Sequence, residues 1–270
     1  MQNVGKFLFL LLGLVPLVEA QPTRVVTLSP VAAEWVSEIL GEKDTRARLV
    51  GVSEFSHFPI YVASIPSIGP YPQIHVEEVI KLKPDLVIAV EASNRPDQIE
   101  KLKRLKLPVT VLKKEKFDEM GDWISELGKA LGEEKRAKSV RDRWEFEVKA
   151  LEPKGESSSV FVQIQSRPLI TIGGGSFITA AFKRVGLNNV FEGLTQDYPK
   201  VSREAVMKHN PDQIWILDLT GDRNEFEKSR TEWERFESLK AVKNGKVRIL
   251  KGDEFARCSM RLLKALKLLK

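Results

Sequence analysis

Residues 71–79 read Tyr-Pro-Gln-Ile-His-Val-Glu-Glu-Val, and residues 198–206 read Tyr-Pro-Lys-Val-Ser-Arg-Glu-Ala-Val. A Pro-Asp pair follows each stretch, at 84–85 and at 211–212, and every matched position is offset by 127 residues. Each copy predicts a loop with an aromatic side chain, a short helix that carries a glutamate and ends before the proline, and then a buried strand. Two such units predict two equivalent lobes, and a cleft between lobes is a natural ligand site.

Short runs of β-branched residues alternate with helical spacing in both halves of the chain. Strands are expected at 24–28, 49–53, 86–90 and 109–112, and again at 160–164, 169–172, 213–217 and 247–250. Helices are expected at 32–40, 76–81, 96–105, 176–185, 202–208 and 257–269. This alternation predicts an α/β fold with two Rossmann-like lobes, each built on a mostly parallel sheet.

The middle of the chain carries a different pattern. Apolar side chains recur there at three- and four-residue steps, as at Met120, Ile124 and Leu127. The pattern predicts one amphipathic helix of about 35 residues, which would be about 50 Å long at 1.5 Å per residue. We therefore expect a rigid linking helix between two lobes, with bounds of 21–116 for the N-terminal lobe, 117–152 for the helix and 153–270 for the C-terminal lobe.

The first twenty residues have the pattern of an export signal. Lys6 precedes an apolar run at 7–18, and Val18-Glu19-Ala20 offers small side chains at the two positions that signal peptidase inspects. The run is shorter than the roughly 20 residues that span a bilayer. We expect a signal peptide at 1–20 and cleavage before Gln21. Because the only cysteine is Cys258, we expect a periplasmic protein without a lipid anchor.

Composition and motifs argue against several other classes of protein. The net charge of +6 does not indicate nucleic-acid binding, because Lys and Arg alternate with Asp and Glu along the helices. His57, His75 and His209 lack the spacing of metal ligands. The glycines at 173–175 are not followed by Lys-Ser or Lys-Thr, so they indicate a tight turn rather than a phosphate loop. We therefore expect a monomer with no nucleic-acid partner, no cofactor, no metal and no enzymatic activity.

Motifs in both halves of the chain match a known family in order and spacing. The first half contains Val-Val-Thr-Leu-Ser-Pro (25–30), Leu-Val-Gly-Val-Ser (49–53) and Lys-Pro-Asp-Leu-Val-Ile (83–88). The second contains Gly-Gly-Gly-Ser-Phe (173–177) and Val-Gly-Leu-Asn-Asn-Val-Phe (185–191). Together they resemble the helical-backbone (class III) periplasmic binding proteins, which serve ABC importers of cobalamin, haem and ferric siderophores. The resemblance implies a cleft between the lobes, with a permease dimer and its ATPase subunits as partners.

Within that family, the likeness is strongest to the members that bind cobalamin, and it implies a set of ligand-binding residues. Phe55 stands where those members have a tyrosine, whereas Tyr71 and Tyr198 stand where they have tryptophans. Asp253 and Arg257 match an Asp and an Arg at the edge of the cleft. Opposed aromatic rings can cover the faces of a macrocycle, and a few polar groups can fix its amide-bearing edge. The implied ligand is cobalamin or a related corrinoid.

The resemblance also implies that one glutamate of each lobe docks on arginines of the permease. Glu77 and Glu204 occupy the matching positions of the repeat. The alternative is that each glutamate only stabilises the start of its helix through the helix dipole. The ligand is open as well: haem is the main alternative, since Tyr71 or Tyr198 could ligate iron. A ferric siderophore comes third, and a zinc-binding protein or a periplasmic hydrolase ranks behind these.

Overall fold

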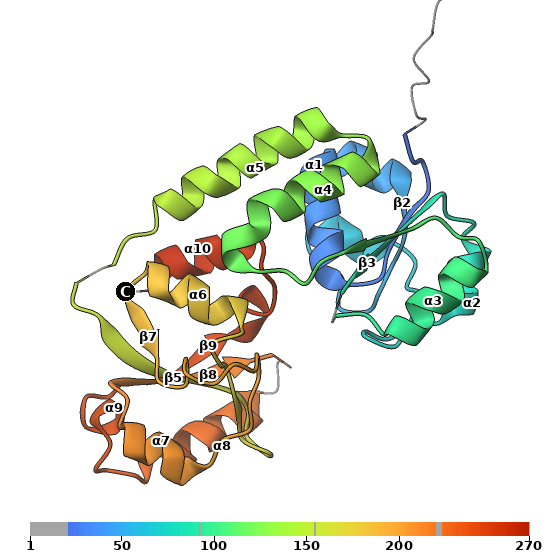
Figure 1. Ribbon diagram of the computed structural model, residues 1–270. Coiled ribbons are helices and arrows are strands. Elements are labelled where there is room, and N and C mark those ends of the chain that lie inside the picture. Colours follow the sequence, from blue (N-terminus) through green and yellow to red (C-terminus); the bar gives the residue numbers. More distant parts are fainter. Residues whose placement is uncertain (1–20, 92, 154, 220–222, 270) are drawn as a thin grey trace, which may run out of the picture.

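Each half of the chain builds its own sheet, and helices flank both sheets (Figure 1). The computed structural model describes residues 21–91, 93–153, 155–219 and 223–269, so the predicted signal peptide at 1–20 lies outside the described residues. The N-terminal sheet has the strand order β2-β1-β3-β4, and all of its pairs are parallel. Its elements are β1 (Val25–Thr27), α1 (Pro30–Arg48), β2 (Leu49–Val52), η1 (Ile60–Ser64), α2 (Val76–Lys81), β3 (Leu86–Val90), α3 (Pro96–Arg104) and β4 (Val109–Leu112).

The C-terminal sheet has the order β6-β5-β8-β9, and β7 also pairs with β5. Only the β5–β6 pair is antiparallel. The elements of this half are β5 (Ser158–Gln165), β6 (Ile170–Thr171), α6 (Phe177–Arg184), β7 (Leu187–Asn189), α7 (Arg203–His209), β8 (Gln213–Asp218), α8 (Arg223–Glu234), α9 (Lys240–Lys243), β9 (Val247–Lys251), η3 (Gly252–Glu254) and α10 (Met260–Leu268). The predicted α/β fold with two lobes and mostly parallel sheets is confirmed.

The sequence repeat is also a structural repeat. Helices α2 and α7, and strands β3 and β8, begin at positions offset by the same 127 residues. In the first copy, the Asp85 carboxylate accepts hydrogen bonds of 2.8 Å from both the main-chain nitrogen and the hydroxyl of Thr23, just before β1. In the second copy, Asp212 accepts equivalent bonds of 2.9 and 2.7 Å from Ser159 of β5. The two aspartates therefore fasten matching strands to their neighbours.

The predicted single linking helix is wrong, because the segment forms two helices packed side by side. These are α4 (Met120–Leu131) and α5 (Glu134–Lys149), and a short turn, η2 (Phe117–Glu119), precedes them. Gly132 ends α4 in the left-handed conformation (φ 67°), which glycine adopts at little cost. A side chain on Gly128 would approach the Ala137 Cβ to 2.2 Å, so the two helices pack very closely. The predicted lobe bounds at 21–116 and 153–270 stay predictions.

One apolar core runs through both lobes and the helical hairpin. It includes Trp35 of α1, Trp144 of α5 and Trp215 of β8. The rings of Trp35 and Trp144 meet edge to face, with centroids 5.4 Å apart. The Trp35 indole donates a 2.8 Å hydrogen bond to the main-chain carbonyl of Cys258, which is fully buried near the start of α10. The lobes are thus joined by shared packing as well as by the chain.

Four elements of the C-terminal half were not predicted: β7, α8, α9 and η3. Helix α8 occupies a polar stretch in which apolar residues are sparse, and β7 and α9 are only three and four residues long. Within the described part of the chain, no helix has both the length and the apolar character that a membrane crossing requires.

Candidate functional site

A cleft lies where the carboxyl ends of the strands of both sheets meet, which is the usual ligand position in open α/β sheets. Two adjoining hollows, of about 280 and 170 Å³, share the side chains of Leu219 and Ala256. The larger one is lined by Pro30 and Val31 after β1, Phe55 and His57 after β2, Tyr71, Glu115 after β4, Asp253 after β9, and Arg257. The smaller one is lined by Ile164, Ile178, Tyr198, Leu217 and Phe255.

The two repeat tyrosines line neighbouring parts of this cleft. Tyr71 comes from the N-terminal lobe and lines the larger hollow, whereas Tyr198 comes from the C-terminal lobe and lines the smaller one. Tyr198 keeps 46 % of its surface exposed. Burial raises the pKa of Tyr198 to about 12, against the opposing effect of the Ser176 side chain, and burial also raises the pKa of Tyr71. Both rings therefore offer neutral aromatic surface to the cleft.

Phe55 presents an aromatic ring at the rim of the larger hollow. It is 63 % exposed, and its main chain is in the left-handed region (φ 66°), which is uncommon for a residue with a side chain. The Arg257 guanidinium donates a 2.7 Å hydrogen bond to the Phe55 carbonyl. This bond comes from the opposite lobe and holds the loop that carries the ring.

A network of charged side chains connects the lobes beneath Phe55. Asp253 binds Arg257 at 2.5 Å, Arg261 at 2.5 Å and His57 at 3.1 Å. Burial disfavours the ionised form of Asp253, but the charge of Arg257 and the hydrogen bonds outweigh it and lower the pKa of Asp253 to about 2. Glu34 of α1, which is buried, lies 3.2 Å from Arg261 and 3.4 Å from Arg257. Every charge of this cluster has an opposite partner.

The five residues implied as ligand contacts all line the cleft: Phe55, Tyr71, Tyr198, Asp253 and Arg257. Their contact with a ligand stays a prediction. Sequence reasoning missed Glu115, Leu219 and Phe255, and it considered His57 only as a metal ligand. Glu115 lies in the charged run at 113–116, which has the composition of a solvated loop. The one signal that pointed to it was its position just after a predicted strand.

The two glutamates of the repeat lie outside the cleft. Glu77 and Glu204 are exposed residues in the first turns of α2 and α7. Glu77 forms a 2.8 Å ion pair with Lys101 of α3, and hydrogen bonding to Lys101 lowers its pKa. The pKa of Glu204 is lowered by its own main-chain N–H and by the Ser202 side chain. Both carboxylates are therefore charged and accessible to a partner.

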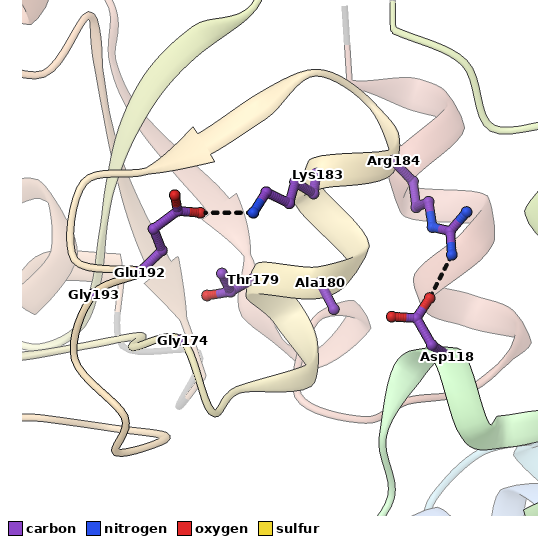
Figure 2. Close-up of a pocket in the computed structure, with 8 residues that line it drawn as sticks. All are labelled: Asp118, Gly174, Thr179, Ala180, Lys183, Arg184, Glu192 and Gly193. Atoms are coloured by element: carbon purple, nitrogen blue, oxygen red, sulfur yellow. Dashed lines mark hydrogen bonds and ion pairs between the residues drawn. The ribbon is translucent and has the colours of Figure 1, made fainter.

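A separate hollow of about 740 Å³ lies beside α6, outside the cleft (Figure 2). Its four charged side chains pair with one another. Lys183 lies 3.2 Å from Glu192, and Arg184 lies 2.5 Å from Asp118 of η2. These pairs are largely exposed, so the hollow holds no unsatisfied group. Among the described residues, no group of three His, Cys, Asp or Glu side chains is arranged to hold a metal ion.

Comparison with known proteins identifies the family. The model of the periplasmic binding protein family matches residues 25–254. The chain belongs to this family. A periplasmic binding protein is a substrate-binding component of an ABC transporter, and this role accounts for a cleft between two lobes.

Individual relatives of this periplasmic binding protein carry several names. A vitamin B12-binding protein of Vibrio vulnificus is 30 % identical over 211 residues, which cover 77 % of this chain and 76 % of the relative. The crystal structure of the periplasmic vitamin B12-binding protein BtuF of Vibrio cholerae has a TM-score of 0.74 and 25 % identity, and the match covers 92 % of this chain and 94 % of that one. A periplasmic haem-binding protein of Pseudomonas aeruginosa has a TM-score of 0.75 and 23 % identity, with 91 % and 90 % covered. That last likeness shows the fold alone.

Proposed function

We propose that this periplasmic binding protein captures a corrinoid, cobalamin or a close relative, and delivers it to an ABC importer. The proposal is carried by Tyr71 and Tyr198, which occupy equivalent positions of the repeat and line adjoining hollows from the two lobes. Aromatic rings from both lobes suit a flat macrocycle, since each stacked contact contributes about 0.5–1.5 kcal/mol beyond its buried area. The exposed ring of Phe55 supplies a third aromatic surface at the rim.

The relatives support the same ligand. The Vibrio vulnificus relative is named for vitamin B12, and so is the Vibrio cholerae structure that matches nearly the whole chain. The implied contacts Asp253 and Arg257 then serve the amide-bearing edge of the corrin, where hydrogen-bonding groups fix the orientation.

Haem is the second candidate, because a tyrosine phenolate can ligate its iron. Two features of the cleft favour the corrinoid instead. Burial raises the pKa of both tyrosines, which opposes formation of a phenolate. In addition, Arg257 is the only Lys or Arg among the described residues that line the two hollows, and its positive charge is already balanced by the Asp253 carboxylate. Few charges are left for the carboxylates of haem or for an anionic siderophore.

Calorimetric titration of the purified mature protein with cyanocobalamin and with hemin tests this proposal. We expect submicromolar binding of the corrinoid, which corresponds to about −8 kcal/mol or better. If hemin binds with a tyrosinate-type absorption band while cyanocobalamin gives no heat, the ligand is haem and the corrinoid proposal fails.

We further propose that Glu77 and Glu204 dock on the permease dimer. They stand at matching places on the two lobes, as contacts with a pseudo-symmetric partner require, and each is exposed. An arginine of the permease would replace Lys101 as the partner of Glu77.

We also propose that the protein is exported to the periplasm, with residues 1–20 removed as a signal peptide and no lipid anchor. Osmotic-shock fluid from a two-membrane host should contain a protein that begins at Gln21. Recovery only in a salt-washed membrane pellet would contradict this location.

A further inference from the structure

Glu115 is the acidic side chain of the cleft whose charge is least compensated. It follows β4 and lines the larger hollow together with Tyr71 and Arg257. Its Oε2 atom is buried and has no hydrogen-bond partner among the described residues. The carboxyl group is close enough to both repeat tyrosines to contribute to their raised pKa values, after the larger effect of burial. An unpartnered acceptor thus lies in the same hollow as the ring of Tyr71.

The cations near Glu115 are bound to other groups. Lys114 donates 2.6 Å to the Oδ1 atom of Asp197 and 3.4 Å to the Gly175 carbonyl, across the cleft in the other lobe. Arg257 is held by Asp253 and by the Phe55 carbonyl. Burial raises the pKa of Glu115 and outweighs the opposing effect of the charge on the neighbouring Lys114. A buried acceptor in this state is costly unless a hydrogen-bond donor reaches it.

We propose that Glu115 is a specificity-determining residue, whose free Oε2 accepts a hydrogen bond from an N–H group on the edge of the bound macrocycle. This role rests on the proposed corrinoid function, and it makes the peripheral amides the part of the ligand that Glu115 recognises. The peripheral amides of a corrinoid supply N–H donors, whereas ionised carboxylates around a porphyrin supply none. A carboxylate placed against Glu115 would also meet a like charge in a partly desolvated site.

A thermodynamic cycle, in which both the Glu115 side chain and the N–H groups of the ligand are changed, measures what this hydrogen bond contributes to the affinity. The two ligands are dicyanocobinamide, which carries peripheral amides, and the heptamethyl ester of dicyanocobyrinic acid, which has the same ring without peripheral N–H groups. Calorimetry gives the affinities of the wild-type protein, Glu115→Leu and Glu115→Gln for each ligand. We expect Glu115→Leu to bind the amide ligand about tenfold or more weakly, as for loss of a hydrogen bond to a buried carboxyl group.

The ester serves as the internal control for the shape of the cleft. Its affinity should change less than threefold in Glu115→Leu, since it has no N–H to lose. Glu115→Gln keeps an acceptor and should bind the amide ligand within about threefold of wild type. Glu119→Leu, an exposed change four residues away on η2, should leave both affinities unchanged. Thermal unfolding of each variant checks that it is folded.

Two results would overturn the inference and are distinguishable from each other. If Glu115→Leu lowers the affinity for both ligands equally, or for neither, then Glu115 does not recognise the amides. The proposed corrinoid function would stand in that case. If the wild-type protein binds neither corrinoid, the proposed function fails, and this role of Glu115 fails with it.

Discussion

Arg257 and Phe55, 202 residues apart in the chain, are joined by a 2.7 Å hydrogen bond from the guanidinium to the main-chain carbonyl. The carbonyl belongs to a residue with a left-handed backbone (φ 66°), a conformation that costs of order 1 kcal/mol or more for a residue with a side chain. The same guanidinium also binds Asp253 at 2.5 Å. One side chain therefore holds an aromatic loop of one lobe against the charged network of the other.

Replacement of Arg257 by lysine tests whether this side chain holds the Phe55 loop against the charged network. Lysine keeps the charge but cannot reach both partners with a planar fork, so we expect a loss of about 1–3 kcal/mol in the free energy of unfolding. Corrinoid affinity should fall about tenfold, because the Phe55 loop loses its anchor and a buried charged hydrogen bond is worth this much. Urea unfolding and calorimetry measure the two effects. Arg46→Lys, in an exposed pair with Glu42, is the control and should change stability by less than about 0.5 kcal/mol.

The aromatic walls of the cleft make a second prediction. Tyr71→Ala and Tyr198→Ala should each weaken corrinoid binding by about 1–3 kcal/mol, since each removes a stacked ring. The chain has three tyrosines, and Tyr61 packs on the core and against Arg46, away from the cleft. Tyr61→Ala should therefore lower the unfolding temperature but leave the calorimetric affinity unchanged. Equal affinity losses in all three variants would mean that the tyrosines act through folding alone.

Reversal of charge at both proposed docking positions, Glu77 and Glu204, separates ligand capture from transport. We expect the double variant Glu77→Arg/Glu204→Arg to lose uptake, because like charges meet at the permease and cost several kcal/mol. Ligand affinity should stay within about threefold, since both residues lie outside the cleft. Each single reversal should cause a partial loss. The assay pairs vitamin-dependent growth with calorimetry on the same variants.

Glu78 provides the matched control for this experiment. It follows Glu77 on α2 but is paired with Lys81 on its own helix, and the repeat matches Glu204 to Glu77 rather than to Glu78. Glu78→Arg should transport normally. Normal uptake by the double variant would assign Glu77 and Glu204 to helix stabilisation, and a joint loss of uptake and binding would assign them to the shape of the cleft.

Two glycines of α4 predict opposite changes in stability. Gly128→Ala should lower the free energy of unfolding by about 1–3 kcal/mol, since the new methyl group collides with Ala137 of α5 and forces the hairpin apart. A Cβ at Gly121 lies 3.0 Å from the flexible end of Glu145 and in ordinary contact, at 3.5 Å, with the Arg141 side chain. Gly121→Ala should be neutral or raise stability by up to about 1 kcal/mol through helix propensity. Urea unfolding measures the free energy of unfolding of both variants. Equal changes in the two variants would contradict close packing of α4 against α5.

The raised pKa of Glu115 predicts a pH dependence of stability. Burial raises it above the ordinary value of 4.5, so the folded protein holds this proton more tightly than the unfolded chain. The stabilising effect is complete below pH 4.5 and is lost as the pH rises through the folded-state pKa. Glu115→Gln does not titrate there. The stability of the variant relative to wild type should therefore increase from pH 4.5 upward in urea unfolding, and a constant difference would contradict burial of the charge.

Strands and helices could be predicted from the sequence where the local pattern of apolar residues is strong. Strands β3 and β4 have the predicted bounds, because each is a continuous apolar or β-branched run. The helical hairpin was missed because one apolar stripe serves a long helix and two antiparallel helices equally well. The available signal was the gap between Leu131 and Val140, with Gly132 inside it. Helix α8 was missed because Phe226 and Trp233 stand seven residues apart among charged residues.

The site was only partly readable. The repeat singled out Tyr71 and Tyr198, and the family resemblance added Phe55, Asp253 and Arg257. Pattern alone could not find Glu115, since it stands in a charged run that looks solvated and its Oε2 atom becomes buried only in the folded chain. The network of Glu34 and Arg261 was invisible for the same reason: these residues are 227 positions apart and meet only in the folded chain.

The reactivity of the buried Cys258 thiol reports how often the two lobes separate. Cys258 is the only cysteine, it lies where Trp35 of the first lobe meets the start of α10, and burial raises the pKa of its thiol well above the ordinary value. Alkylating reagents attack the thiolate, so labelling must wait until water reaches the sulfur. The rate at which Cys258 is labelled therefore reports the frequency of opening, and no cysteine has to be introduced. A ligand that bridges the cleft should lower this rate.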